Sequence, residues 1–102
     1  MAAQYARILR MHLKLDCIEQ AKKIFEESVI PLCKNQKGFV SAYFLADRES
    51  GTCIPITIWE SEEDMLETER SAFFQEQIIK FMPFFKSPPI REGYEIVLLD
   101  NE

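Results

Sequence analysis

The segment 52–60, TCIPITIWE, constrains the fold most, because as a strand it would carry apolar side chains on both faces. Three isoleucines alternate with a second, mainly apolar row that ends at Trp59. A strand with one face in water alternates apolar with polar residues, so this one must be covered on both sides. In a chain of 102 residues, helices can cover one face, and a second copy of the chain is the simplest cover for the other.

The composition is that of one ordinary globular domain over residues 1–102, with 47% hydrophobic and 28% charged residues. Seventeen acidic residues against twelve basic ones give a net charge of −5, which argues against nucleic acid or an anionic membrane surface as a partner. Apolar runs are far shorter than the ~20 residues that span a bilayer, and the start of the chain lacks a signal-peptide core. We therefore expect a cytoplasmic protein.

The cysteines give no sign of a metal site. Cys17, Cys33 and Cys53 are widely spaced, form no CxxC pair, and are accompanied by a single histidine. We interpret them as reduced, largely buried thiols and expect no bound metal.

The pattern of apolar and turn residues predicts the element order β-α-β-β-α-β. The first helix contains Pro31 near its end, which should kink the helix or restart it. The second begins after Ser61, which suits its N-cap, and is interrupted near Ser71. The order favours an α+β, ferredoxin-like fold, in which a four-stranded antiparallel sheet carries its helices on one face and has its first and third strands in the middle. The expected strands are 4–14, 39–46, 52–60 and 93–99.

The turn DRESG should join strands 39–46 and 52–60 into a hairpin and thereby set their register. Because a central proline removes a ladder hydrogen bond, we expect a bulge at Pro55. We predict that Val40 lies opposite Trp59, on the face toward the helices. The other face would be the dimer interface, with Ser41 opposite Ile58 and the interface residues Tyr43, Ile54, Ile56 and Ile58.

Several segments together resemble the antibiotic biosynthesis monooxygenase-like family of dimeric α/β barrels. They extend from Tyr5 to Leu99 and are YARI, IFEESVIPLCKNQKGF, ADRESG, ITIWESEEDM, SAFFQEQIIKFMPFF, and the PP break before YEIVLL. The resemblance implies a homodimer whose two sheets form a barrel, with a ligand cavity in each subunit between sheet and helices. Some family members are oxygenases that need no cofactor and use the substrate's own carbanion to reach oxygen. Others degrade haem or act on quinols and small signalling molecules.

The family's functional residues carry over only in part. The quinone-forming oxygenases have an Asn four residues before the strand tryptophan and a Tyr six residues after it. Here Pro55 and Met65 occupy these positions, and Trp59 alone matches. The haem-degrading branch uses a Trp and a His on the second helix. In this chain Trp59 and His12 lie outside that helix, which argues against haem degradation by that mechanism.

The sequence therefore predicts a homodimeric, cofactor-independent monooxygenase-like protein acting on a small aromatic or quinol-type molecule. His12 is the one plausible catalytic base, because its unperturbed pKa suits proton transfer near neutrality. The alternative is a non-catalytic module that binds a small ligand or assembles through its sheet. The expected substrate pocket consists of Trp59, Thr57, Phe25, Phe74 and Ile78.

Overall fold

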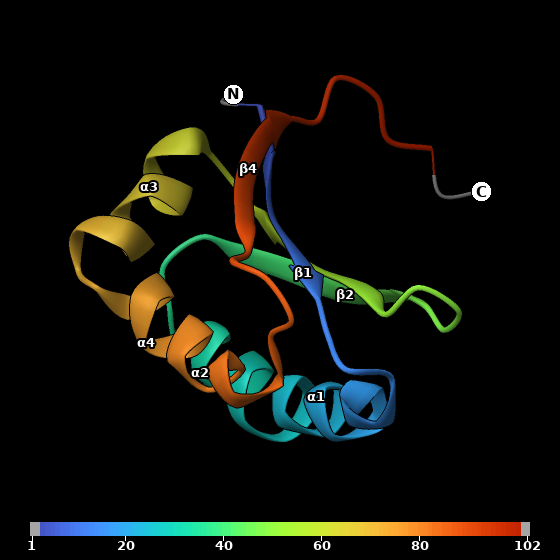
Figure 1. Ribbon diagram of the computed structural model, residues 1–102. Helices are drawn as coiled ribbons and strands as arrows, with labels where there is room; N and C mark the ends of the chain where they lie inside the picture. The colour runs from blue at the N-terminus through green and yellow to red at the C-terminus, as the bar shows by residue number, and fades with distance from the viewer. Residues whose placement is uncertain (1–2, 101–102) are drawn as a thin grey trace.

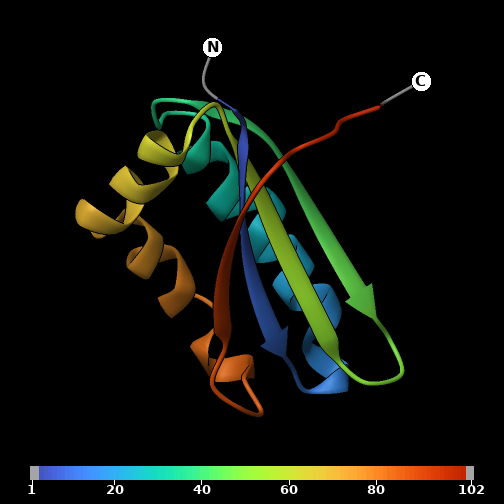
Figure 2. The ribbon, with the colours of Figure 1, turned by 90° about the horizontal axis from the view of Figure 1, so that it is seen from above.

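The computed structural model describes residues 3–100, which form one antiparallel sheet with helices on one side of it. The strands follow the order β2-β3-β1-β4, so β1 and β3 are central, and the predicted ferredoxin-like arrangement is confirmed. Figure 1 shows the helices gathered on one side of the sheet, and Figure 2 looks onto the other side, which carries no helix. The strands are β1 (Tyr5–His12), β2 (Phe39–Asp47), β3 (Thr52–Trp59) and β4 (Ile90–Glu95).

The first helical segment has the irregularity that Pro31 predicts, although it lies one turn earlier. It consists of η1 (Leu15–Cys17), α1 (Ile18–Ile24), η2 (Phe25–Val29) and α2 (Ile30–Cys33). The turn η2 is a π-helix, in which the N–H of Ile30 donates to the carbonyl of Phe25. Because a proline ring clashes with the carbonyl four residues before it, a wider turn at this point relieves the clash.

The second helical segment is also broken, as predicted near Ser71. It consists of α3 (Glu62–Arg70), α4 (Phe73–Ile79) and η3 (Met82–Phe84). Ser61 caps α3 by accepting a hydrogen bond from the N–H of Asp64 at 3.1 Å. Ala72 separates the two helices with a left-handed backbone, at φ 67°. Of the helices in residues 3–100, none is long and apolar enough to cross a membrane.

The core lies between the helices and one face of the sheet, which we call the inner face. From β1, the side chains of Leu9 and Met11 point into it, and Leu13, just after the strand, is completely buried there. Phe25 from η2 packs against Phe44 from β2, with ring centroids 5.5 Å apart. Since side chains alternate along a strand, the residues between these positions lie on the opposite, outer face.

The hairpin register agrees with the prediction at most positions. Tyr43 lies opposite Ile56, and Ser41 lies opposite Ile58. The bulge, however, lies at Val40, so that Phe39 takes the place opposite Trp59 that was predicted for Val40.

The predicted bulge at Pro55 is wrong. Pro55 pairs in register with Phe44, and the β1–β3 register is the same on both sides of it. In the described sheet, the β1–β3 ladder has no pair between Ile8–Ile56 and Met11–Cys53, so Pro55 interrupts the ladder without causing a bulge.

The last strand is displaced from the predicted 93–99. It begins at Ile90 and ends at Glu95, because Glu95 lies opposite Tyr5, where β1 begins. One further bond joins the N–H of Ile96 to the carbonyl of Gln4 at 2.8 Å. Beyond it the chain runs away from the body (Figures 1 and 2), leaving exposed the apolar side chains of Val97, Leu98 and Leu99.

Candidate functional site

A partly open cavity of about 50 Å³ lies between the inner face of the sheet and the helices. The structure brings together in its wall all five residues predicted for a substrate pocket: Phe25, Thr57, Trp59, Phe74 and Ile78. The rest of the apolar wall is formed by Leu9, Val29, Cys33, Pro55, Phe73 and Phe81.

Local structure explains why these residues converge. Thr57 and Trp59 are two apart on β3 and therefore share the inner face. Phe74 and Ile78 are four apart on α4 and therefore share one side of that helix. The left-handed turn at Ala72 lets α4 begin in a new direction after α3 ends.

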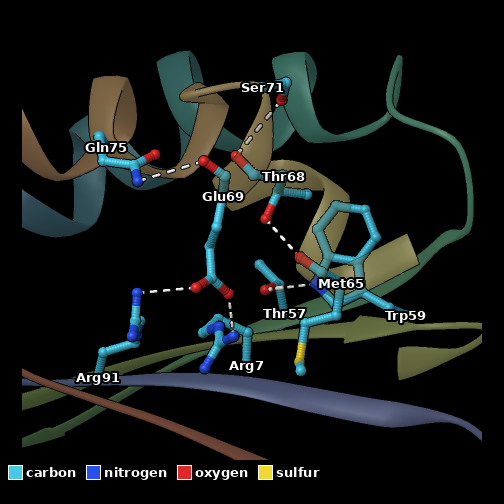
Figure 3. Close-up of polar contacts among 9 residues, drawn as sticks. All are labelled: Arg7, Thr57, Trp59, Met65, Thr68, Glu69, Ser71, Gln75 and Arg91. Atoms are coloured by element: carbon cyan, nitrogen blue, oxygen red, sulfur yellow. Dashed lines mark hydrogen bonds and ion pairs between the residues drawn. The ribbon is translucent and has the colours of Figure 1, made fainter. Parts of the chain in front are cut away.

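The indole of Trp59 is fixed at the cavity wall by two contacts. Its Nε1–H donates to Oγ1 of Thr57 at 2.9 Å (Figure 3), and Phe39 packs edge-on against it with ring centroids 5.5 Å apart. Trp59 is only 2% exposed. The indole therefore provides a rigid apolar surface, and the hydrogen bond orients the threonine hydroxyl.

Arg7 is the main polar residue of the cavity, and the sequence reasoning missed it. It extends from β1 on the inner face and is 7% exposed. Its Nη2 donates to Glu69 of α3, which also pairs with Nη1 of Arg91 at 2.7 Å, so that Glu69 lies between two arginines (Figure 3). Burial lowers the pKa of Arg7, and the carboxylate of Glu69 opposes this shift.

Two neighbours hold the guanidinium group of Arg7 in place. Phe74 lies with its ring centroid 5.6 Å from Cζ, a cation–π distance. Gly93 lies opposite Arg7 on β4, where a Cβ would come within 2.9 Å of Nη1. A signal for this site exists in the sequence, since Arg7 alternates with Leu9 and Met11 and is thus a charge in an inward-facing apolar row.

The Nε of Arg7 is buried and has no hydrogen-bond partner among the described residues. Nearby, Gln77 uses its Oε1 to accept from Nζ of Lys80 at 2.8 Å, and Thr68 donates to the carbonyl of Met65 at 2.7 Å. Burial raises the pKa of the Cys33 thiol to about 11, so this wall residue stays neutral. Among the described residues, those lining the cavity include no Asp, Glu, His or Tyr.

His12 lies elsewhere. It is exposed at the end of β1, on the outer face, and its Nε2 is 2.7 Å from the carbonyl oxygen of Ser50 in the hairpin turn. It does not contribute to the cavity wall, and its role as a catalytic base stays a prediction.

The four residues predicted for a dimer interface lie together on the outer face. Tyr43 is 55% exposed, Ile54 and Ile56 are half-buried, and Ile58 is 9% exposed. They are joined there by Leu45, which is 49% exposed. Their use as an interface stays a prediction as well.

Cys33 and Cys53 are buried and Cys17 is half-buried, and all three are free thiols, as expected. In residues 3–100 no three His, Cys, Asp or Glu side chains are grouped as a metal site would require.

The solved structures most similar to this fold include antibiotic biosynthesis monooxygenases. A monooxygenase of Streptomyces coelicolor, crystallised with nanaomycin D, is 16% identical, with 98% of this chain and 93% of that chain covered at a TM-score of 0.74. The cofactor-independent oxygenase SnoaB of Streptomyces nogalater is 12% identical, with 99% and 100% covered at 0.75. A haem-degrading protein of Mycobacterium tuberculosis is 16% identical, with all of both chains covered at 0.70. The fold of the predicted family is thereby confirmed.

Comparison of sequences identifies fewer relatives than comparison of structures. No protein-family model matches the chain. Uncharacterized proteins from two strains of Mycobacterium tuberculosis are 31% identical over 61 residues, which are 60% of this chain. The matched segment spans about a quarter (27%) of the length of these relatives.

Proposed function

We propose that this protein binds a small aromatic or quinol-type molecule in the cavity beside Trp59 and acts on it as a cofactor-independent monooxygenase. The observation that carries the proposal is the convergence of three predicted pocket residues with the Trp59–Thr57 pair on one cavity; the three are Phe25, Phe74 and Ile78. Such a wall suits a flat ring, and water-free surroundings favour reactions of a substrate carbanion. The fold shared with an oxygenase that works without a cofactor supports this chemistry.

The reaction needs no cofactor, but besides the substrate and dioxygen it needs a base that takes up one proton and returns it to the peroxide. An acidic C–H of the substrate loses its proton, and the carbanion passes electrons to O₂ to form a peroxide on that carbon. When the same carbon carries a second hydrogen, loss of water leaves a carbonyl group. One oxygen atom thus stays in the product and the other leaves as water.

The cavity must widen to admit a ring. Its volume of about 50 Å³ is well below the roughly 150 Å³ that accommodate benzene in an engineered cavity. Helix α4 is the wall that we expect to move, because it has only seven residues and follows the break at Ala72. Single-ring ligands are therefore the right first probes.

A non-catalytic, ligand-binding module is the second candidate, and the wall composition favours it. A general base must come within hydrogen-bond reach of the proton that it removes. Among the described residues, the cavity wall supplies no carboxylate, imidazole or phenol for that purpose. Binding without turnover would follow from such a wall.

Oxygen uptake with a panel of hydroxyquinols separates the two candidates. Trp59 is the single tryptophan of the chain, so quenching of its fluorescence reports binding in the same samples. Uptake that is lost in Trp59→Ala supports the enzyme, whereas quenching without uptake supports the binding module. His12→Ala tests the predicted base, and unchanged uptake in that variant would remove His12 from the mechanism. Absence of both quenching and uptake would contradict the ligand site itself.

We further propose that the protein acts as a homodimer packed through the outer faces of its two sheets. The apolar outer face, and the exposed side chains that follow β4, support a second copy as the cover. Leu45→Glu should yield monomers in sedimentation experiments at micromolar concentration. Leu32→Glu, at a leucine that is 42% exposed on α2, is the matched control and should leave the dimer intact. A wild-type monomer at that concentration would refute the proposal.

A further inference from the structure

We infer that the cavity selects aromatic ligands that carry an ionised oxygen, a phenolate or a carboxylate, and that Arg7 binds this oxygen through its Nε–H. The inference rests on the proposed ligand site and names its ligand class. The observation that points to a ligand is the Nε of Arg7, which is buried at the cavity and has no partner among the described residues. A buried donor without an acceptor costs free energy, so an acceptor brought by a ligand gains affinity.

The arrangement of hydrogen bonds leaves mainly donors for a ligand. The hydroxyl oxygen of Thr57 accepts from Trp59, so the O–H of Thr57 can donate to a different acceptor. Gln77 accepts from Lys80 through Oε1, so its amide group keeps its two N–H donors. With the Nε–H of Arg7, these three side chains offer four donors, and the described wall has no carboxylate. This set matches an oxygen with several lone pairs and a negative charge.

The charges at the wall point the same way. In residues 3–100, Glu69 is the one carboxylate paired with Arg7, and it is shared with Arg91, so this group of three carries one net positive charge. The carboxylate is held at Nη2, on the same edge of the guanidinium as Nε–H, and the Nε–H itself has no partner among the described residues. A ligand anion at Nε would lie beside the Glu69 carboxylate, and the second arginine of the group, Arg91, offsets the repulsion between these two anions. This local positive charge contrasts with the net charge of −5 of the whole chain.

The geometry also fixes the ring next to the charge. Phe74 lies over the guanidinium and lines the same cavity, so a ligand whose oxygen reaches Nε places its ring beside Phe74 and Trp59. An oxygen attached directly to the ring, or through one carboxyl carbon, meets both requirements.

Calorimetric titration with three single-ring probes tests the inference. The probes are 4-nitrophenol, 4-nitrobenzoate and the neutral isostere 4-nitroanisole. We expect the wild type to bind the two anions more tightly than the anisole and to lower the pKa of bound 4-nitrophenol, seen as phenolate absorbance below the pH at which the free phenol ionises. Arg7→Gln should weaken anion binding by about 10- to 100-fold and leave the anisole unchanged.

Two further variants keep the test decisive. Arg7→Lys retains the charge beside Glu69 but lacks Nε, and it should fold and still lose anion preference. Arg10→Gln removes an exposed arginine from the outer face of the same strand and should bind all three probes like the wild type. Equal wild-type affinity for anisole and anions, or equal weakening of both by Arg7→Gln, overturns the inference alone. Absence of binding by any probe overturns the ligand site on which it rests.

Discussion

Replacing Glu69 by glutamine should destabilise the fold strongly, because it leaves Arg7 buried without its counter-charge. The side chains of Arg7 and Glu69 are 8% and 15% exposed. Removing one partner of a buried ion pair costs about 3–5 kcal/mol. The glutamine carbonyl can still accept from Arg7, so we expect the lower end, about 3 kcal/mol, in the free energy of unfolding. In a domain of this size that loss lowers the melting midpoint by more than about 10 °C.

Urea unfolding followed by Trp59 fluorescence measures the loss, and Glu63→Gln is its matched control. Glu63 lies on the same helix and pairs with Arg70, but its side chain is 73% exposed. Exposed ion pairs contribute little, so the control should unfold almost like the wild type. An unchanged midpoint for Glu69→Gln, or equal shifts in both variants, would refute the reasoning that burial sets the strength of this pair.

Three smaller perturbations test other features of the fold. Ala72→Gly should raise the free energy of unfolding by up to about 1 kcal/mol in urea titrations, because the left-handed backbone at φ 67° disfavours any side chain; a loss of stability would contradict this. Ser61→Ala should lower the free energy of unfolding by about 1 kcal/mol through loss of the α3 cap, and Ser61→Asp should retain most of that stability. The pKa of Cys33 is raised to about 11, so the folded state keeps this proton while the unfolded state loses it above pH 9. The wild type should therefore lose up to about 2 kcal/mol relative to Cys33→Ala between pH 9 and 11, and parallel pH profiles would exclude the shift.

The fold could be predicted from the sequence because local signals agreed with one another. The turn after Asp47 determined which residues of the hairpin face each other, and alternation then placed Thr57 and Trp59 on the inner face. Two predicted details, the site of the bulge and the bounds of the last strand, were wrong because they depend on the neighbouring strand. The site of the bulge depends on where β2 meets β3 at Trp59, and the end of β4 depends on where β1 begins.

For the cavity too, local patterns predicted one part, and contacts between distant residues determined the other. Its apolar wall follows from periodicity, since Phe74 and Ile78 share a helix face and Trp59 occupies an inward strand position. Its polar side is signalled by Arg7 in an inward-facing apolar row, but the partner Glu69 lies 62 positions away, and no local pattern reveals that contact. The sequence reasoning instead selected His12 for its chemistry, and strand alternation places that side chain on the outer face.

The two roles of the Arg7 guanidinium, pairing with Glu69 and binding a ligand anion, can be tested together in the variant Glu69→Gln. In the unliganded protein Glu69 compensates its charge, and in the complex a ligand anion adds to that compensation. If both roles are right, Glu69→Gln lowers the stability of the free protein and at the same time tightens the binding of 4-nitrobenzoate. Two like unit charges about 4 Å apart repel by about 4 kcal/mol at an effective dielectric constant of about 20, so removing the carboxylate should tighten anion binding tenfold or more. The affinity for 4-nitroanisole should stay the same. A variant that is destabilised but binds the anion no better would leave Arg7 a structural residue whose charge is directed only at Glu69.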